Sequence, residues 1–329
     1  MVRFAVIGTN WITDRFISAA TKVEGFQLTA IYSRTKERAE EFASKHQVHR
    51  IFTSLEELAQ CEEVDAVYIA SPNSFHKKQA ILMMKNKKHV LCEKPMASNS
   101  SEVKEMIHVA KKEDVLLMEG LKTTALPNFL VLKEHLHKIG TIRRFVTSFC
   151  QYSSRYDAYK AGTVLNAFKP EFSNGALMDI GIYCVFPTVA MFGRPNEVKA
   201  IGHLLKSGVD GQGSLLLQYD SMEAVIMYSK ITDSALPTEI QGEDGSIIID
   251  KIHTPERVHI HYRDGRVEDI SAPQDEEAMF DEARVFIEAI QNGEKEVACN
   301  KLEYSVETAL ILEEARRQIG VTYSADLSD

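Results

Sequence analysis

Hydrophobic residues in the first third of the chain form short continuous runs, and the stretches between them carry charged residues at helical spacing. Such runs, rich in Val, Ile and Leu, are typical of parallel strands that are buried on both faces. Because strands that alternate with helices are joined by right-handed crossovers, we expect a doubly wound parallel sheet with helices on both faces. The pattern predicts strands at residues 2–7, 26–32, 64–70, 89–92 and 115–118, and helices at 12–22, 36–45, 55–60, 74–85 and 100–112.

The pattern changes after residue 120. From 197 to 270, short alternating segments follow one another with turn signals such as Asp244-Gly245 and Asp264-Gly265, which is typical of antiparallel strands. Residues 153–172 are polar and aromatic without periodicity, as in a loop. We expect a mainly antiparallel open sheet of about six strands. A long strand at 142–151 and helices at 130–137, 176–191, 277–292 and 303–319 complete this part. The predicted domains are therefore an α/β dinucleotide-binding type at 1–120 and an α+β type at 121–329.

Composition narrows the possible partners. The 329 residues, 44% of them hydrophobic, are enough for two domains with substantial cores. The formal net charge is −9 and no basic block occurs, so we expect neither nucleic acid nor an anionic membrane surface as a partner. No apolar run suggests a membrane span, and the first residues form a strand and not a secretory signal. We expect a cytoplasmic protein without a bound metal, because the five cysteines are scattered: Cys61, Cys92, Cys150, Cys184 and Cys299.

The loop after the first strand reads Gly8-Thr9-Asn10-Trp11-Ile12-Thr13. A dinucleotide loop needs glycine for its tight turn and for close approach of the backbone to a pyrophosphate on the helix N-terminus. Only Gly8 is a glycine here. Asn10 stands at the second glycine position and tolerates a positive φ better than most residues. The loop alone leaves a plain strand–helix turn open, whereas its place at the first strand and helix favours a nucleotide.

The end of the second strand suggests which nucleotide. Folds that prefer NAD place Asp or Glu there to bind the ribose hydroxyls, but this chain has Ser33 and Arg34, with Arg38 one turn later. Hydroxyl and guanidinium groups suit a phosphate, which points to NADP, with NAD still possible. A solvated helix start is the alternative. Basic residues in a first helical turn oppose the helix dipole, however, and a bound anion would explain them.

Two further strand ends carry polar residues. Ser71-Pro72-Asn73-Ser74 precedes a helix that Asn73 and Ser74 could cap, and His76 either contacts the cofactor or makes a structural bond. The strand at 89–92 ends in Glu93-Lys94-Pro95. Proline stops the strand, so the charged pair lies at the carboxyl edge of the sheet, where ligands bind. A surface salt bridge followed by a turn is the alternative for this pair.

The helix predicted at 176–191 carries Asp179 and Tyr183 within an apolar segment. Residues four apart share one helix face. A buried carboxylate and phenol need partners. The two residues therefore form either a structural pair or an acid/base pair that faces a cleft.

Glu93-Lys94-Pro95 together with Gly175-Ala-Leu-Met-Asp-Ile-Gly-Ile-Tyr183 resembles the Gfo/Idh/MocA family of oxidoreductases along nearly the whole chain. Tyr183 and the Gly8-Thr9-Asn10-Trp11-Ile12 opening resemble the branch that contains dihydrodiol dehydrogenase, glucose-fructose oxidoreductase and NADP-dependent aldose dehydrogenases. The resemblance implies that Lys94 lies near the nicotinamide, that Tyr183 transfers the proton and that Asp179 orients the substrate or Lys94. It also implies a homodimer or homotetramer formed through the open sheet of the second domain.

The chemistry is consistent with this resemblance. Hydride transfer to a carbonyl leaves an alkoxide that needs a proton donor, and an ammonium favours ionisation of a nearby phenol. We therefore expect Lys94 to assist Tyr183 at the junction of the two domains, with Glu93 positioning Lys94. The expected cofactor contacts are Gly8, Thr9, Asn10, Trp11, Ile12, Ser33, Arg34, Arg38, Ser71, Pro72, Asn73, His76, Glu93 and Lys94.

Polar and aromatic residues after position 120 could bind a sugar, a polyol or a cyclic diol. The predicted substrate lining is Lys122, Arg155, Tyr156, Asp157, Tyr159, Asn166, Asp179 and Tyr183. The function we expect is an NADP(H)-dependent dehydrogenase of such a substrate. A non-catalytic NAD(P)-binding regulator and an enzyme that never releases its cofactor are the alternatives.

Overall fold

The computed structural model describes residues 1–327, and the chain divides into two compact units. The first comprises Met1–Ala97, Ser101–Lys122 and Asp275–Leu302; the second comprises Ser98–Ser100, Thr123–Gln274 and the chain from Glu303 onward. A single boundary at 120 therefore misses two segments: Ser98–Ser100 belongs to the second unit, and Asp275–Leu302 returns to the first.

A six-stranded parallel sheet forms the centre of the first unit, in the order β3-β2-β1-β4-β5-β6. This is the doubly wound arrangement predicted from the sequence, and it places the carboxyl ends of all strands at one edge. The strands are β1 Val2–Ile7, β2 Phe26–Tyr32, β3 Arg50–Phe52, β4 Ala66–Ile69, β5 His89–Glu93 and β6 Leu117–Gly120. The helices are α1 Trp11–Ala20, α2 Lys36–Lys45, α3 Leu55–Ala59, α4 His76–Lys85, α5 Ser100–Glu113 and α9 Phe280–Gln291.

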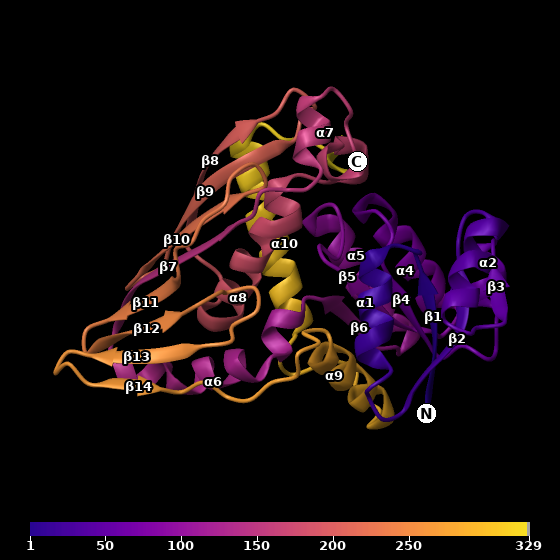
Figure 1. Ribbon diagram of the computed structural model, residues 1–329, viewed down its shortest axis with the longest axis horizontal. Coiled ribbons are helices and arrows are strands. Elements are labelled where there is room, and N and C mark those ends of the chain that lie inside the picture. The colour runs from indigo at the N-terminus through magenta and orange to yellow at the C-terminus, as the bar shows by residue number, and fades with distance from the viewer. Residues whose placement is uncertain (328–329) are drawn as a thin grey trace. The chain divides into compact units, whose positions relative to one another are not determined.

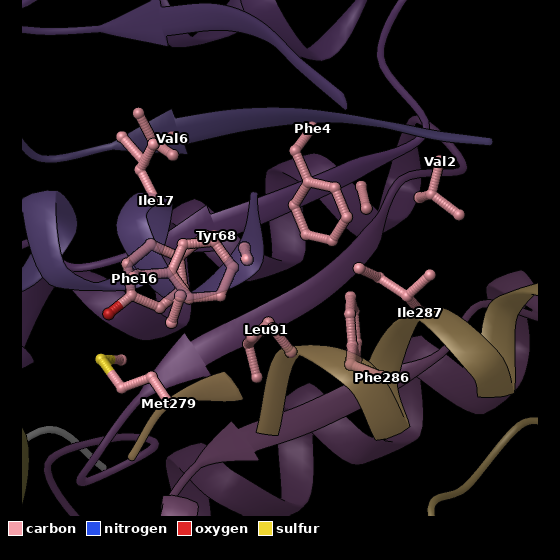
Figure 2. Close-up of a cluster of buried hydrophobic side chains, with 14 of the residues drawn as sticks. Val2, Phe4, Val6, Phe16, Ile17, Tyr68, Leu91, Met279, Phe286 and Ile287 are labelled. Carbon is pink, nitrogen blue, oxygen red and sulfur yellow. The ribbon is translucent and has the colours of Figure 1, made fainter. Parts of the chain in front are cut away.

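Aromatic side chains from four elements build one core of this unit (Figure 2). Phe4 of β1 lies 6.1 Å from Phe16 of α1 and 6.0 Å from Phe286 of α9, measured between ring centroids. The Phe16 ring stacks on Tyr68 of β4, with centroids 3.8 Å apart. Because Phe286 is fully buried in this cluster, α9 belongs to the first unit although segments of the second unit lie on both sides of it in sequence.

The second unit is built on an eight-stranded sheet in the order β14-β13-β12-β11-β7-β10-β9-β8 (Figure 1). Its neighbouring strands are antiparallel except β7 and β10, which run parallel. The strands are β7 Ile142–Cys150, β8 Glu197–Leu204, β9 Asp210–Gln218, β10 Glu223–Ser229, β11 Thr238–Gly242, β12 Gly245–Ile249, β13 Val258–Tyr262 and β14 Val267–Asp269. The helices are α6 Pro127–His135, α7 Tyr156–Lys160, α8 Ile182–Phe192 and α10 Leu302–Ile319.

Helices cover one face of this sheet. The apolar helix α8 packs on β7 and β10, and α10 lies on the same side (Figure 1). Residues on β9 alternate accordingly, since Leu215 and Leu217 are fully buried and Leu216 is 52% exposed. The exposed face of Leu216 and its neighbours is the open face of the sheet.

Several local expectations were wrong. The three-residue strand β3 was missed because it is too short to show a pattern. The segment 153–172, predicted as a loop, contains α7 and two short 3-10 turns. The helix predicted at 176–191 begins as a π-helical turn, Leu177–Gly181, before α8. By length and composition the stretch Pro170–Phe192 could cross a membrane, but 78% of its apolar 18-residue window is buried inside the protein, as in a core helix.

Candidate active site

Gly8 ends β1 and turns the chain into α1. Its φ is +108°, and a Cβ at this position would lie 2.7 Å from the carbonyl oxygen of Ala70, at the end of the neighbouring strand β4. Both the backbone conformation and the space exclude other residues. The one glycine of the predicted nucleotide loop therefore occupies the position where the turn needs it.

Asn10 has a different role from the predicted one. Its φ is −109°, so it does not adopt the positive φ of a second glycine. Its side-chain oxygen accepts hydrogen bonds from the N–H groups of Ile12 (3.0 Å) and Thr13 (3.3 Å), and its amide donates to the Ala70 oxygen (2.8 Å). Asn10 is thus the N-cap of α1 and ties the loop to the end of β4.

Arg38 joins the first loop to α2. Its guanidinium donates to the side-chain oxygen of Thr9 (3.2 Å) and to the Thr9 carbonyl (2.7 Å), and it pairs with Glu41 (2.6 Å). Arg34 is exposed at the tip of β2, beside Ser33. The structure therefore brings the predicted loop and the predicted phosphate-binding residues together at the carboxyl edge of β1 and β2. Trp11, 57% exposed, lies on the same loop.

His76 is a structural residue in this unit. It is fully buried, and its ring nitrogens lie 2.8 Å from the Ser71 carbonyl oxygen and 3.0 Å from that of Pro95. Burial lowers the pKa of the ring. His76 thus links the loop after β4 to the turn after β5. The predicted cap by Asn73 and Ser74 is wrong, because α4 begins at His76 without a side-chain cap.

Glu93, the last residue of β5, is 8% exposed and held on both oxygens. The Tyr68 hydroxyl donates to Oε1 (2.6 Å), and the Lys94 N–H donates to Oε2 (3.2 Å). Burial raises the pKa of this carboxyl, opposed by the Lys94 ammonium and by the Tyr68 hydrogen bond. The stacked core tyrosine therefore fixes the carboxylate that adjoins Lys94.

The Lys94-Pro95 peptide is cis and begins a turn. A hydrogen bond to β6 holds this turn. The Met96 N–H donates to the carboxylate of Glu119 (2.8 Å). The Lys94 side chain is half-buried in the first unit, whereas Asp179 and Tyr183 belong to the second. The predicted joint action of Lys94 and Tyr183 stays a prediction.

Lys122 and Glu282 are two further ionisable groups near Glu93. Burial lowers the pKa of Lys122, opposed first by Glu282. Glu282 on α9 is fully buried, and within the described chain neither of its carboxyl oxygens has a hydrogen-bond partner. Burial raises its pKa well above the usual value, and Glu93 adds to this. Sequence reasoning missed Glu282, although helical spacing places it on the apolar stripe of α9 with Met279 and Phe286.

In the second unit, the π-helical turn that carries Asp179 is anchored at its start. The Leu177 N–H donates to the fully buried carboxyl of Asp210 (2.7 Å) on β9. Gly175 has φ +150°, and a Cβ there would lie 2.2 Å from Asp210 Oδ1. Burial raises the pKa of Asp210 to about 6. The Gly175-Ala-Leu-Met-Asp motif therefore needs its glycine to admit this carboxyl.

Asp179 forms an ion pair with Lys230, which follows β10 directly. Lys230 is 4% exposed, and its ammonium also lies 5.5 Å from the centre of the Phe168 ring. Sequence reasoning missed Lys230. Strand periodicity could have found it, because Ala224, Ile226 and Tyr228 are buried at alternate positions of β10 and position 230 continues their alternation.

Tyr183, on the first turn of α8, lies among aromatic rings. Phe149 of β7 is 5.7 Å away and His253 is 6.4 Å away between ring centroids, and these two rings stack on each other at 4.0 Å. Tyr183 and Asp179 are both partly exposed in an otherwise buried segment. This arrangement offers a phenol, a carboxylate and a flat aromatic wall, which suits a ring-shaped polar ligand with apolar faces.

The remaining predicted substrate residues divide into two groups. Tyr156 and Tyr159 of α7 pack with Phe168 in a small satellite cluster, and the Tyr159 hydroxyl accepts from the Ser207 N–H (3.1 Å). Arg155, Asp157 and Asn166 are exposed. Packing thus accounts for the two tyrosines without a ligand, and the exposed three stay predictions.

Two other features lie outside this chemistry. Among residues 1–327, no group of three or more His, Cys, Asp or Glu side chains is arranged to hold a metal ion. A hollow of about 700 Å³ lies on the open face of the second unit's sheet, and no predicted site residue lines it. It is lined by residues of β7 to β11 and of the turn before β10, including Arg143, Arg144, Lys199, Leu216, Tyr219 and Glu223.

Comparison with known proteins identifies the family of the chain. The model of an oxidoreductase family with an NAD-binding Rossmann fold matches residues 2–121, and that of the GFO/IDH/MocA C-terminal domain matches residues 132–248. The chain is 60% identical over 326 residues to the scyllo-inositol 2-dehydrogenase (NADP(+)) IolU of Bacillus subtilis (strain 168), covering 99% of each chain. It is 30% identical over 335 residues to a trans-1,2-dihydrobenzene-1,2-diol dehydrogenase of Xenopus tropicalis, covering 98% of this chain and 99% of the other.

A solved structure shares the whole architecture. KijD10, a 3-ketoreductase from Actinomadura kijaniata in complex with NADP and TDP-benzene, superposes with a TM-score of 0.86 at 25% identity, covering 98% of this chain and 99% of that chain. The resemblance predicted from the two motifs is therefore confirmed. Since both halves match domains of one family and a dehydrogenase shares 60% of the residues along the full length, the chain belongs to the Gfo/Idh/MocA family of oxidoreductases.

Proposed function

We propose that this protein is an NADP(H)-dependent dehydrogenase that oxidises a secondary hydroxyl of an inositol or a closely related cyclic polyol. The observation that carries the proposal is the 60% identity, over 99% of both chains, with a scyllo-inositol 2-dehydrogenase that uses NADP(+). Lys94, Asp179 and Tyr183 are all present, which favours an enzyme over a non-catalytic regulator. We also propose that the enzyme acts in the cytoplasm.

The choice of NADP is supported by the tip of β2. Ser33, Arg34 and Arg38 provide one hydroxyl and two guanidinium groups, and no carboxylate stands at the ribose position. Guanidinium groups bind a phosphate through paired hydrogen bonds. Arg38 is exposed and already tied to the nucleotide loop through Thr9, so its position is fixed before a nucleotide binds.

A bound nicotinamide would supply the acceptor for the hydride that leaves the carbon carrying the substrate hydroxyl. Tyr183 removes the hydroxyl proton as the general base and returns it when the reaction runs backwards. Lys94 favours the ionised phenol and holds the substrate oxygen, because an ammonium stabilises a nearby negative charge. Glu93 positions Lys94 through the hydrogen bond that it accepts from the Lys94 backbone N–H.

The side chains around Tyr183 support a cyclic polyol as the substrate. The stacked rings of Phe149 and His253 offer a flat wall beside the phenol. A cyclic polyol presents apolar C–H groups on its ring faces and hydroxyls at its rim. The aromatic wall suits those faces, and Asp179 suits a rim hydroxyl.

The test is turnover of scyllo-inositol, myo-inositol and aldoses with NADP+ and with NAD+, followed by absorbance of the reduced nicotinamide. We expect NADP+-dependent oxidation of an inositol. Tyr183→Phe should lower kcat by about 10²- to 10⁴-fold with unchanged thermal stability. Tyr304→Phe is the matched control, since it removes a half-buried phenol on α10 that has no proposed role.

Two results would refute the proposal. Turnover by Tyr183→Phe within a few-fold of wild type would remove Tyr183 from the mechanism. Binding of NADPH without turnover of any polyol would favour the non-catalytic regulator instead.

A second copy of the chain is the partner we propose for the open sheet face. The face exposes Ile201 (75%) and Leu216 (52%), and Leu216 lines the hollow described above. Exposed apolar residues gathered on one sheet face are typical of an interface. Light scattering should give a dimer or tetramer, and Leu216→Arg should yield a monomer; a wild-type monomer would contradict the idea.

A further inference from the structure

Lys230 is a buried cation that the proposed mechanism does not yet use. It follows β10 and is 4% exposed, and within the described chain its ionic partner is Asp179. The side chain of Asp179 remains 32% exposed. One side of this carboxylate therefore faces a fixed ammonium inside the unit, and part of it is accessible from outside.

The backbone around Lys230 is held on both sides. Its N–H donates to the Gly211 carbonyl (2.9 Å), and its carbonyl accepts from the Ser153 N–H (2.9 Å). The ammonium lies over the Phe168 ring at 5.5 Å from the centroid. A long side chain anchored at its base and packed along its length has little freedom, so it can fix the carboxylate that it binds.

The π-helical turn Leu177–Gly181 is thus attached to the sheet at two points. Asp210 of β9 accepts from the Leu177 N–H, and Lys230 after β10 binds Asp179 two residues later. The buried side chains of Asp210 and Tyr228 lie beneath the turn, and Tyr183 follows it on α8. Two attachments from neighbouring strands set both the position and the orientation of Asp179.

We propose that Lys230 is a positioning residue of this dehydrogenase: it holds Asp179 as a fixed carboxylate that accepts a hydrogen bond from a substrate hydroxyl, and so leaves proton transfer to Tyr183. The inference depends on the proposed function and adds a division of labour within the site. A carboxylate paired with a buried ammonium is a poor proton acceptor, because protonation would leave the ammonium without a counter-charge in the interior.

The test compares Lys230→Met with wild type over a range of pH. Methionine keeps the length and apolar stem of lysine and removes the charge. We expect kcat/KM for the polyol to fall about 100-fold, as when a contact group is misplaced. The acid limb of the pH–rate profile should move up by roughly one to three pH units, because removing a nearby cation makes a carboxylate easier to protonate. Binding of NADPH should be unchanged, since the predicted cofactor residues lie in the other unit.

Lys251→Met is the matched control. Lys251 is an exposed lysine of the same unit that pairs with Glu256 on the surface, and its removal should leave both activity and pH profile unchanged. Asp179→Asn and the double variant Lys230→Met/Asp179→Asn complete a cycle. If Lys230 acts through Asp179, the double variant should be no slower than Asp179→Asn alone.

A folded Lys230→Met with wild-type kcat/KM and an unmoved acid limb would overturn the inference, as would multiplying effects in the double variant. Should Lys230→Met not fold, Lys230→Gln keeps a hydrogen-bond donor and gives the same pH–rate comparison. Should the wild-type protein oxidise no polyol, the proposed function fails by itself. The ion pair is then tested by following the carbon-13 resonance of the Asp179 carboxyl with pH. A higher titration midpoint in the Lys230 variant supports the inference, and an unchanged midpoint overturns it.

Discussion

Replacing Glu282 by glutamine removes the ionisable group of α9 while it keeps the size and shape of the side chain. Glu282 is fully buried, and in the described part of the chain neither carboxyl oxygen has a hydrogen-bond partner. Burial raises its pKa well above the usual value, Glu93 pushes it further up, and Lys122 opposes this. The folded protein therefore keeps the Glu282 proton to higher pH than the unfolded chain, which releases it above its ordinary pKa of 4.5.

The sign and size of the effect follow from proton linkage. Between the ordinary and the raised pKa, the folded state binds one proton more than the unfolded state, so stability is full at low pH and falls as pH rises. One proton corresponds to about 1.4 kcal/mol per pH unit. Glu282→Gln lacks this loss. As the pH rises from the ordinary to the raised pKa, the free energy of unfolding of Glu282→Gln should increase relative to wild type by about 1.4 kcal/mol per pH unit. Asp210, with a pKa raised to about 6, is present in both proteins and cancels in the difference.

Urea unfolding at several pH values measures this difference. Trp11 is the single tryptophan of the chain and lies in the first unit, as Glu282 does, so its fluorescence follows the relevant unfolding. Glu276→Gln, which changes an exposed carboxylate just before α9, is the control and should follow wild type. If wild type and Glu282→Gln change in stability in parallel as the pH rises above 4.5, the folded protein ionises Glu282 at its ordinary pKa and the reasoning fails.

Three further outcomes concern the nucleotide loop. Gly8→Ala should destabilise the protein by more than about 1 kcal/mol in urea unfolding, since its Cβ would meet the Ala70 oxygen at a positive φ; Gly162→Ala, with positive φ but nothing within 4 Å, should cost less. Arg38→Met should raise KM for NADP+ about tenfold or more and leave KM for NAD+ unchanged; equal effects on both would refute a phosphate contact. NADPH should quench the emission of Trp11, and unchanged emission at saturating NADPH would count against the loop as the binding site.

The parallel sheet of the first unit was predictable because each strand and helix carries its own local pattern. The predicted strand at 26–32 and helix at 36–45 have the bounds of β2 and α2. The motif at Glu93-Lys94-Pro95 could be placed at a sheet edge for the same reason, since a buried strand directly precedes it. Local pattern therefore suffices where an element and its burial are decided by neighbouring residues.

Local pattern fails where packing joins distant segments. Helix α9 returns to the first unit because Phe286 packs on Phe4, more than two hundred positions away, and nothing between them marks the return. Lys230 and Asp179 are 51 positions apart, and only the folded sheet shows that they pair. The π-helical turn at Leu177–Gly181 likewise depends on the buried Asp210 below it, which the sequence of the turn does not reveal.

Glu93 and Asp179, the two carboxylates nearest to the predicted chemistry, are held by the same kind of arrangement. Tyr68, whose ring is part of the stacked core, donates to Glu93, and Lys230, whose stem is buried, binds Asp179. Each carboxylate is thus fixed by a side chain from the interior of its own unit. These two contacts are present without substrate, so each carboxyl group is oriented before substrate arrives. This pre-organisation lowers the cost of ordering the site during the reaction.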